Sequence, residues 1–352
     1  MPKFFQLIAL LLIAPEILAQ GEPLDFTEVK LVDLDRPTYP SAALERKAES
    51  WVVLTAMIDS LGKPYEIRVK ESAALESSFR KGFEQAAMRS LQNSNFEPAR
   101  LNGEPRDSSF TILYPFFLQN NKVEITQRFK RRHDRFEQAL AEGDQEKAES
   151  FLNQIEQIGA FNRSEYALLE TDKYQYSLKF SDDIDARADH LYKALMVENL
   201  MLNEEIEYPT LPDDMTEYLR LALLSTEIER SRFGEAQEVA QMLSTSGTDL
   251  SAFSTALQKI EDIKTDGTQY SVFGTTDGDG DWGIKLHKRT IYLDNLGNAL
   301  NELRFYCQQE YRTFKFVEEQ TLTIPPSWGD CFLVINGEPN ATLELIQFRS
   351  DD

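Results

Sequence analysis

The run from Trp51 to Asp59 constrains the fold more than any other stretch, because it is apolar at nearly every position. Successive side chains of a strand point to opposite faces of its sheet, so such a run belongs to a strand that is covered on both faces. The turn signal Ser60-Leu61-Gly62-Lys63 follows, and Gly62 can adopt a positive φ there. We therefore predict a central strand that ends in a tight turn.

The next segments predict a small α+β layer. A short helix is expected at residues 41–47, before the central strand. Residues 65–70 alternate between apolar and charged side chains, which predicts a strand with one dry face and one wet face. Residues 79–91 carry an apolar stripe at helical spacing, and residues 110–118 alternate again. The order hairpin, helix, strand predicts a sheet with a helix on one face.

Over residues 37–118 the chain resembles the C-terminal domain of TonB-type energy transducers. The resemblance rests on the order and spacing of the motif residues Tyr39, Pro40, Gly62, Phe96, Pro98 and Gly103. Two positions depart from the family pattern, because Ser50 stands where the family has a glycine and Ser94 where it often has a tryptophan. The resemblance implies the hairpin, helix, strand fold and the capture of a short extended segment of an outer-membrane transporter.

The third strand is expected to pair beside the first and thus to form an edge of the sheet. An exposed edge can bind an extended peptide through backbone hydrogen bonds. The predicted partner-binding edge consists of Phe110, Ile112, Tyr114, Phe116 and Leu118. Pro115 removes one backbone donor, which is typical of an edge strand. The alternative is that Pro115 blunts the edge, so that the domain only packs against its neighbours.

The N-terminus predicts export. Lys3 precedes an apolar stretch at residues 4–14, and Ala19 offers a small residue for cleavage. A membrane-spanning helix needs about 20 apolar residues, and this stretch is shorter. We therefore expect a cleaved signal peptide at residues 1–19, a periplasmic location and a polar spacer at residues 20–36. The alternative is an uncleaved inner-membrane anchor, which the family's transducers carry together with a long proline-rich spacer.

Residues 127–263 show helical periodicity almost throughout. Two helices are expected to meet at Gly143-Asp144, and a unit that begins at Gly143 resembles another that begins at Gly234. This partial repeat predicts an all-α array that resembles degenerate tetratricopeptide repeats, with an ordinary helical bundle as the alternative.

Residues 268–350 are rich in short strand patterns, which predict a small all-β sandwich or barrel. Cys307 and Cys331 are the only cysteines of the chain. An oxidising compartment favours their pairing, and closing that loop would stabilise the folded state by roughly 3 kcal/mol. A multidomain chain is therefore expected, in which an α+β domain at residues 37–120 precedes the helical and the β-rich regions.

The sequence indicates no catalytic, cofactor or metal site. Asp277, Asp279 and Asp281 match the first ligand positions of a calcium loop, but Trp282 and Lys288 stand where glycine and glutamate are required. A solvated acidic turn is the better interpretation. The histidines, His133, His190 and His287, lie far apart and have no metal-ligand spacing.

The net charge of -22 disfavours binding to nucleic acid and to anionic lipid, apart from one basic run at residues 128–135. Together these patterns predict a non-enzymatic interaction or scaffold protein of the cell envelope. Its expected partners are periplasmic or outer-membrane proteins, among them TonB-dependent transporters, and membrane contact is indirect unless the N-terminus is uncleaved. A TonB-type energy transducer for outer-membrane transport is the alternative function.

Overall fold

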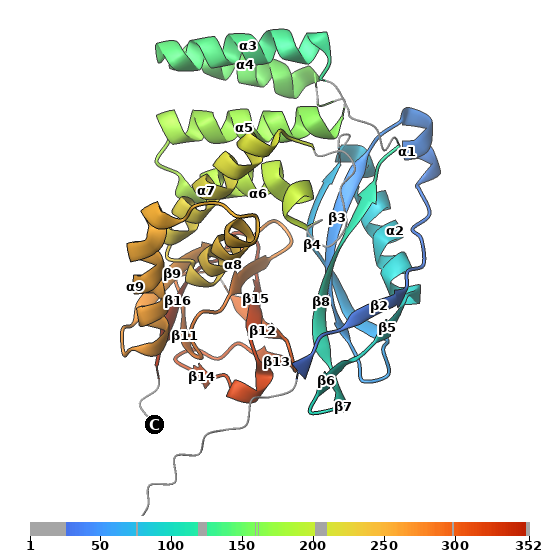
Figure 1. Cartoon of the computed structure of the whole chain (residues 1–352), viewed down its shortest axis with the longest axis vertical. Coiled ribbons are helices and arrows are strands. Elements are labelled where there is room, and N and C mark those ends of the chain that lie inside the picture. The colour runs from blue at the N-terminus through green and yellow to red at the C-terminus, as the bar shows by residue number, and fades with distance from the viewer. Residues whose placement is uncertain are drawn as a thin grey trace, which may run out of the picture.

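The computed structural model describes residues 26–74, 77–118, 125–158, 160, 162–200, 210–297 and 299–349 (Figure 1). The predicted signal peptide at residues 1–19 lies outside this part of the chain. No helix within it is both long and apolar enough to cross a membrane.

The first region contains the predicted hairpin, helix and strand. Its main elements are α1 (Ser41–Arg46), β3 (Ser50–Ile58), β4 (Pro64–Ala74), the short 3-10 helix η1 (Ser77–Phe79), α2 (Arg80–Asn93) and β8 (Ser108–Phe116). The sheet has the order β4-β3-β8, and both strand pairs are antiparallel. Helix α2 covers one face, where Val52, Leu54 and Ile58 pack against Phe83 and Leu91. The predicted α+β architecture is therefore confirmed.

Residues 20–36 were predicted to form a polar spacer, but the structure has folded strands from Phe26 onward. Strand β1 (Phe26–Thr27) pairs with β6 (Ala99–Leu101), which also pairs with β7 (Glu104–Arg106). Strand β2 (Lys30–Asp33) pairs with β5 (Asn95–Glu97). Leu31 and Leu34 pack against the core of the first region. Residues 26–34 are therefore part of this fold, and the strands are too short to show a clear period in the sequence.

Seven helices of the described chain form the second region. They are α3 (Gln127–Glu142), α4 (Gln145–Ile158), α5 (Arg163–Phe180), α6 (Ile184–Leu200), α7 (Asp213–Glu229), α8 (Phe233–Thr245) and α9 (Ser254–Thr265). From α3 to α8, consecutive helices pack on one another, and α3 and α4 lie farthest from the β-rich region (Figure 1). Gly143 ends α3 in the left-handed conformation, with φ of 73°, as the predicted turn requires.

The third region is a sandwich of two antiparallel sheets. One sheet has the order β10 (Asp281–Lys285), β15 (Cys331–Gly337), β12 (Leu300–Cys307), β13 (Tyr311–Lys315). The other has the order β14 (Thr321–Thr323), β11 (Thr290–Asn295), β16 (Thr342–Phe348), β9 (Tyr270–Thr275). Their inner faces share one apolar core, and Cys307 and Cys331 form a disulfide between paired residues of β12 and β15.

Strand β3 is the central strand of the three-stranded sheet, and all nine of its residues are buried. Opposite α2, Trp51 and Val53 pack against Met196 of α6. Farther along the same face, Met57 packs against Tyr306 and Val334 of the sandwich. The apolar residues on both faces of β3 therefore have separate partners, one set in α2 and the other in the two C-terminal regions.

Candidate functional site

Strand β8 forms a regular end of the three-stranded sheet. It pairs with β3 from Ser108, opposite Ile58, to Phe116, opposite Ser50, without a register shift. Among the described residues, no backbone hydrogen bond joins the other side of β8 to a further strand. The strand order places β8 at the opposite end of the sheet from β4, and Figure 1 shows its ribbon crossing in front of the sheet. A continuous, unshifted edge of this kind can template another strand.

The opposite end of the sheet is less regular. Strand β4 shows two register irregularities against β3, one between Val53 and Leu54 and one between Thr55 and Met57. Glu66 in β4 has a positive φ of 47°. Bulges twist a strand and interrupt its hydrogen-bonding pattern, which disfavours the addition of another strand. The comparison of the two ends therefore favours β8 as a docking edge.

Four of the five predicted edge residues contribute their side chains to the core. Tyr114 and Phe116 are 1% and 3% exposed, and Phe110 packs against Phe96 with ring centroids 5.0 Å apart. Ile112 also packs against this core. Leu118 lies beyond the end of β8, and its N–H donates to Glu49 Oε1 at 2.9 Å. The side chains of Phe110, Ile112, Tyr114 and Phe116 are thus structural, so docking at this strand would use its backbone groups.

Pro115 indicates which backbone groups face away from β3. It pairs opposite Trp51 without a register shift although it has no N–H group. Its nitrogen therefore occupies a position that the ladder with β3 does not need. Alternate residues of a strand direct their N–H groups to the same side, so Ser109, Thr111 and Leu113 present their donors at the free edge. Sequence periodicity could not identify them, because this assignment depends on the register with β3.

A hollow lies beside the polar face of β8. Its volume is about 200 Å³, and it separates the three-stranded sheet from the sandwich. Thr55, Ser109 and Thr111 line one side, and Tyr306 and Phe332 line the other. The hydroxyl groups of Thr55 and Thr111 are 3.2 Å apart. This polar hollow leaves the face of β8 opposite α2 incompletely covered near its N-terminal half.

The family motif residues form the frame of the domain. Gly62 accepts a backbone hydrogen bond from Phe96 at 3.2 Å, and a Cβ atom at Gly62 would lie 2.0 Å from the Phe96 carbonyl oxygen. The Tyr39 hydroxyl donates to the Ala48 carbonyl at 2.5 Å. The remaining motif residues are Pro40 before α1, Pro98 between β5 and β6, and Gly103 with a positive φ between β6 and β7. These residues position β8 without lying on its free edge.

The histidines pair with carboxylates of other helices or with backbone. His133 Nδ1 lies 3.0 Å from both carboxylate oxygens of Asp172, and His190 Nδ1 lies 2.8 Å from Glu170. Burial raises the pKa of Asp172 to about 6, and its hydrogen bond to His133 opposes that rise. The part of the chain that the structure describes contains no group of three or more histidine, cysteine, aspartate or glutamate residues suited to a metal ion.

The acidic residues of the predicted turn form hydrogen bonds and ion pairs within the protein. Asp277 Oδ1 accepts the N–H groups of Asp279 and Asp281, each at 2.9 Å. The carboxylate of Asp281 lies 3.1 Å from Arg68 Nη2 in β4 and 3.8 Å from Arg304 in β12. The expectation of a solvated turn is therefore wrong for Asp281, because this half-buried group joins the first region to the sandwich.

These features define an α+β domain with one regular free edge, which is a geometry suited to protein binding. Residues 35–117 match the model of the family described as "Gram-negative bacterial TonB protein C-terminal". A solved structure described as "Solution NMR structure of Pseudomonas aeruginosa TonB CTD" shares 25% identity with the chain. That alignment covers 27% of this chain and 92% of the other, with a TM-score of 0.22. No curated protein matches the chain.

The predicted resemblance is thus confirmed for the first region. The matched family consists of protein-interaction domains, and the match supports a place in the Gram-negative cell envelope. It ends before α3, so it does not extend to the helical region or the sandwich.

Proposed function

We propose that this chain is a protein-interaction module of the cell envelope that binds an extended segment of a partner by strand addition along β8. The observation that carries the proposal is the regular, unshifted edge of β8 at the end of its sheet. The outward N–H groups of Ser109, Thr111 and Leu113 would form the new ladder. The family match adds support, because it covers all of the strands in this sheet.

The location and the wider architecture are part of the same proposal. Residues 1–19 would direct export to the periplasm and be cleaved, and the partners would be periplasmic or outer-membrane proteins. The helices at residues 127–263 would form a scaffold resembling tetratricopeptide repeats, beside the β-rich region at residues 268–350. A role as a TonB-type energy transducer is the second candidate, and the family match is the observation that favours it.

The test places a photo-crosslinking amino acid at Thr111 in cells, with Asn153 as the control position. Both residues are exposed, and Asn153 lies on α4, far along the chain from β8. We expect a discrete adduct with an envelope protein from position 111 and none from position 153. An outer-membrane transporter as the captured partner would support the transducer role, whereas another envelope protein would support a scaffold.

A backbone substitution tests whether the adduct depends on strand addition. With the crosslinker moved to the exposed Pro115, Thr111→Pro removes one outward donor, whereas Thr111→Ala removes only the hydroxyl. We expect the proline variant to lose the adduct and the alanine variant to keep it, with melting temperatures confirming that both fold. An adduct that survives in the folded proline variant, or equal adducts from positions 111 and 153, would contradict the proposal.

A further inference from the structure

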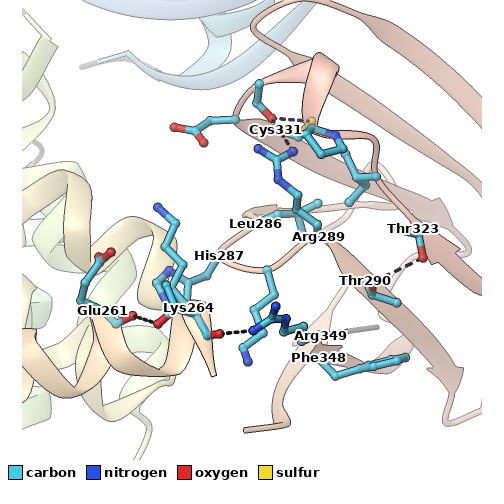
Figure 2. A pocket seen from close by; sticks show the side chains of 16 residues that line it. Glu261, Lys264, Leu286, His287, Arg289, Thr290, Thr323, Cys331, Phe348 and Arg349 are labelled. Atoms are coloured by element: carbon cyan, nitrogen blue, oxygen red, sulfur yellow. Dashed lines mark hydrogen bonds between the residues drawn. The ribbon is translucent and has the colours of Figure 1, made fainter. Parts of the chain in front are cut away.

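A second concave site lies between α9 and one end of the sandwich (Figure 2). Its volume is about 610 Å³, which is within the range of about 300–1,000 Å³ that is usual for small-ligand sites. Helix α9, the loop between β10 and β11, the turn before β15 and the end of β16 form its walls. None of its lining residues belongs to the first region, and it shares only Asp330 and Cys331 with the hollow beside β8.

The charge of this pocket is opposite to that of the chain. Four cationic side chains line it, and two carboxylates, those of Glu261 and Asp330, accompany them. The cations are Lys264, Lys288, Arg289 and Arg349. The chain as a whole has a net charge of -22, so the presence of four cations in one pocket needs an explanation. Burial lowers the pKa of Lys288, the charge of Asp266 opposes this shift, and the charge of Arg349 adds to it.

Backbone carbonyl groups hold three of these cations in place. Arg349 Nη1 donates to the Thr265 carbonyl at 2.7 Å, and Arg289 Nη1 donates to the Pro325 and Gly329 carbonyls at 3.2 and 3.3 Å. The buried Lys288 Nζ donates to the carbonyls of Asp266 and Thr268 at 2.9 and 2.5 Å. These carbonyl groups orient the two arginines without cancelling their charge, whereas Lys288 Nζ also lies 3.8 Å from the carboxylate of Asp266. Each arginine uses Nη1, so other guanidinium N–H groups can still bind an anion.

Apolar side chains complete the walls. Leu286, Ile324 and Phe348 line the cavity, together with Cys331 of the disulfide. Figure 2 shows Lys264 on the α9 side and Arg289 on the wall that carries Cys331. A ligand that fits both parts has an anionic group and an apolar group. Because two carboxylates also line the cavity, a monoanion fits better than a phosphate dianion.

We propose that this pocket binds a carboxylate that is attached to an apolar group. Lys264, Arg289 and Arg349 would bind the carboxylate, and Leu286, Ile324 and Phe348 would contact the apolar part. Two sources supply this chemistry, namely the free C-terminus of a peptide that ends in an apolar residue and a small aryl or alkyl carboxylic acid. This site would give the protein a ligand in addition to the segment bound at β8.

Isothermal titration calorimetry on the full chain tests the proposal with two pairs of probes. The first pair is N-acetyl-Ala-Ala-Phe and its C-terminal amide, and the second is 3-phenylpropionate and 3-phenylpropanamide. We expect each carboxylate to bind at least about tenfold more tightly than its neutral amide, because charge-assisted hydrogen bonds are lost with the charge. Tighter binding of the peptide acid than of 3-phenylpropionate would identify a peptide terminus, and equal binding would identify a simple carboxylic acid.

Charge-matched variants locate the binding. The double variant Lys264→Gln and Arg349→Gln removes two pocket cations, whereas Lys259→Gln and Lys315→Gln removes two exposed cations elsewhere. We expect the pocket variant to bind the carboxylates about tenfold more weakly and the control to bind like the wild type. Melting curves establish that both variants fold. Equal binding of acid and amide, no binding of any probe at millimolar concentration, or unchanged binding by the folded pocket variant would overturn the proposal.

Discussion

The indole ring of Trp51 lies edge-on against the ring of Tyr166, with centroids 4.8 Å apart and planes at 84°. This contact joins β3 to α5, and Trp51 is only 1% exposed. Nearby, the guanidinium of Arg163 lies 4.6 Å from the centroid of the Phe117 ring. Around Trp51 and Phe117, the face of the sheet opposite α2 is therefore an internal interface, so this part of the face is not available for a partner.

A double-mutant cycle on Trp51→Leu and Tyr166→Leu measures this coupling. Edge-on aromatic pairs contribute about 1 kcal/mol beyond the area that they bury, so the two substitutions should be non-additive by about that amount in the free energy of unfolding. Urea denaturation gives the four required values. The control pairs Tyr166→Leu with Trp282→Leu, which belongs to another region and should be additive. Additivity of the Trp51 and Tyr166 substitutions would contradict this account.

The ion pair between Arg68 and Asp281 predicts a second contribution to stability. The two side chains are 19% and 20% exposed, and Nε and Nη1 of Arg68 are buried without a hydrogen-bond partner among the described residues. Asp281→Asn should therefore lower the free energy of unfolding by about 2 kcal/mol, since it leaves a half-buried cation without its counter-charge. Asp279→Asn changes an exposed carboxylate of the same turn and should have an effect below about 0.5 kcal/mol. Equal effects in urea denaturation would be inconsistent with this role.

Glu71 predicts a pH dependence of stability. Burial raises its pKa to about 7, Asp189 and Glu170 add to the rise, and Lys70 and Lys193 oppose it. The folded-state pKa of Glu71 thus exceeds its ordinary value of 4.5. The contribution of the protonated Glu71 carboxyl to the free energy of unfolding is therefore complete below pH 4.5 and is lost as the pH rises through 7.

The variant Glu71→Gln tests this dependence. The free energy of unfolding of this variant should equal that of the wild type near pH 4. Above pH 7 it should be higher by up to about 3 kcal/mol, because glutamine does not ionise. Urea denaturation between pH 4 and 8 measures the difference. Glu45→Gln, at an exposed position of α1, serves as the control. A difference between Glu71→Gln and the wild type that does not change with pH would rule out this cause.

The disulfide predicts sensitivity to reduction. Cys307 and Cys331 are 24 residues apart, and closing a loop of this length stabilises the folded state by about 3 kcal/mol in the chain-entropy model. A reductant should therefore lower the free energy of unfolding of the wild type by about that amount. The double variant Cys307→Ser and Cys331→Ser should start at the lower value and should not respond to reductant. A full response of the serine variant would show that the reductant acts elsewhere.

The sequence predicted the parts of the fold that leave a long periodic pattern. The apolar run that starts at Trp51 identified β3 as a strand buried on both faces, and Gly62 identified the turn after it. Strands β1, β2 and β14 contain two to four residues, which is too few to distinguish them from loops. Only the structure shows that residues 26–33 pair with strands about 70 residues farther along the chain.

The candidate sites were harder to predict from the sequence than the fold. The alternation of Phe110, Ile112 and Tyr114 showed an apolar face, but the orientation of the free N–H groups depends on the register with β3. The cations of the pocket come from α9, from the loop between β10 and β11 and from the residue after β16, and they meet only because α9 packs against the sandwich. No local motif could have brought Lys264 and Arg349 together.

The burial of β3 on both faces has a consequence for the order of folding. Trp51 and Met57 are synthesised early, but their partners Tyr166, Tyr306 and Val334 emerge much later. Until then the face opposite α2 exposes its apolar side chains, and such surfaces promote aggregation. Contacts between residues so distant in sequence also slow folding. The chain therefore reaches its native state only after its last strands are made.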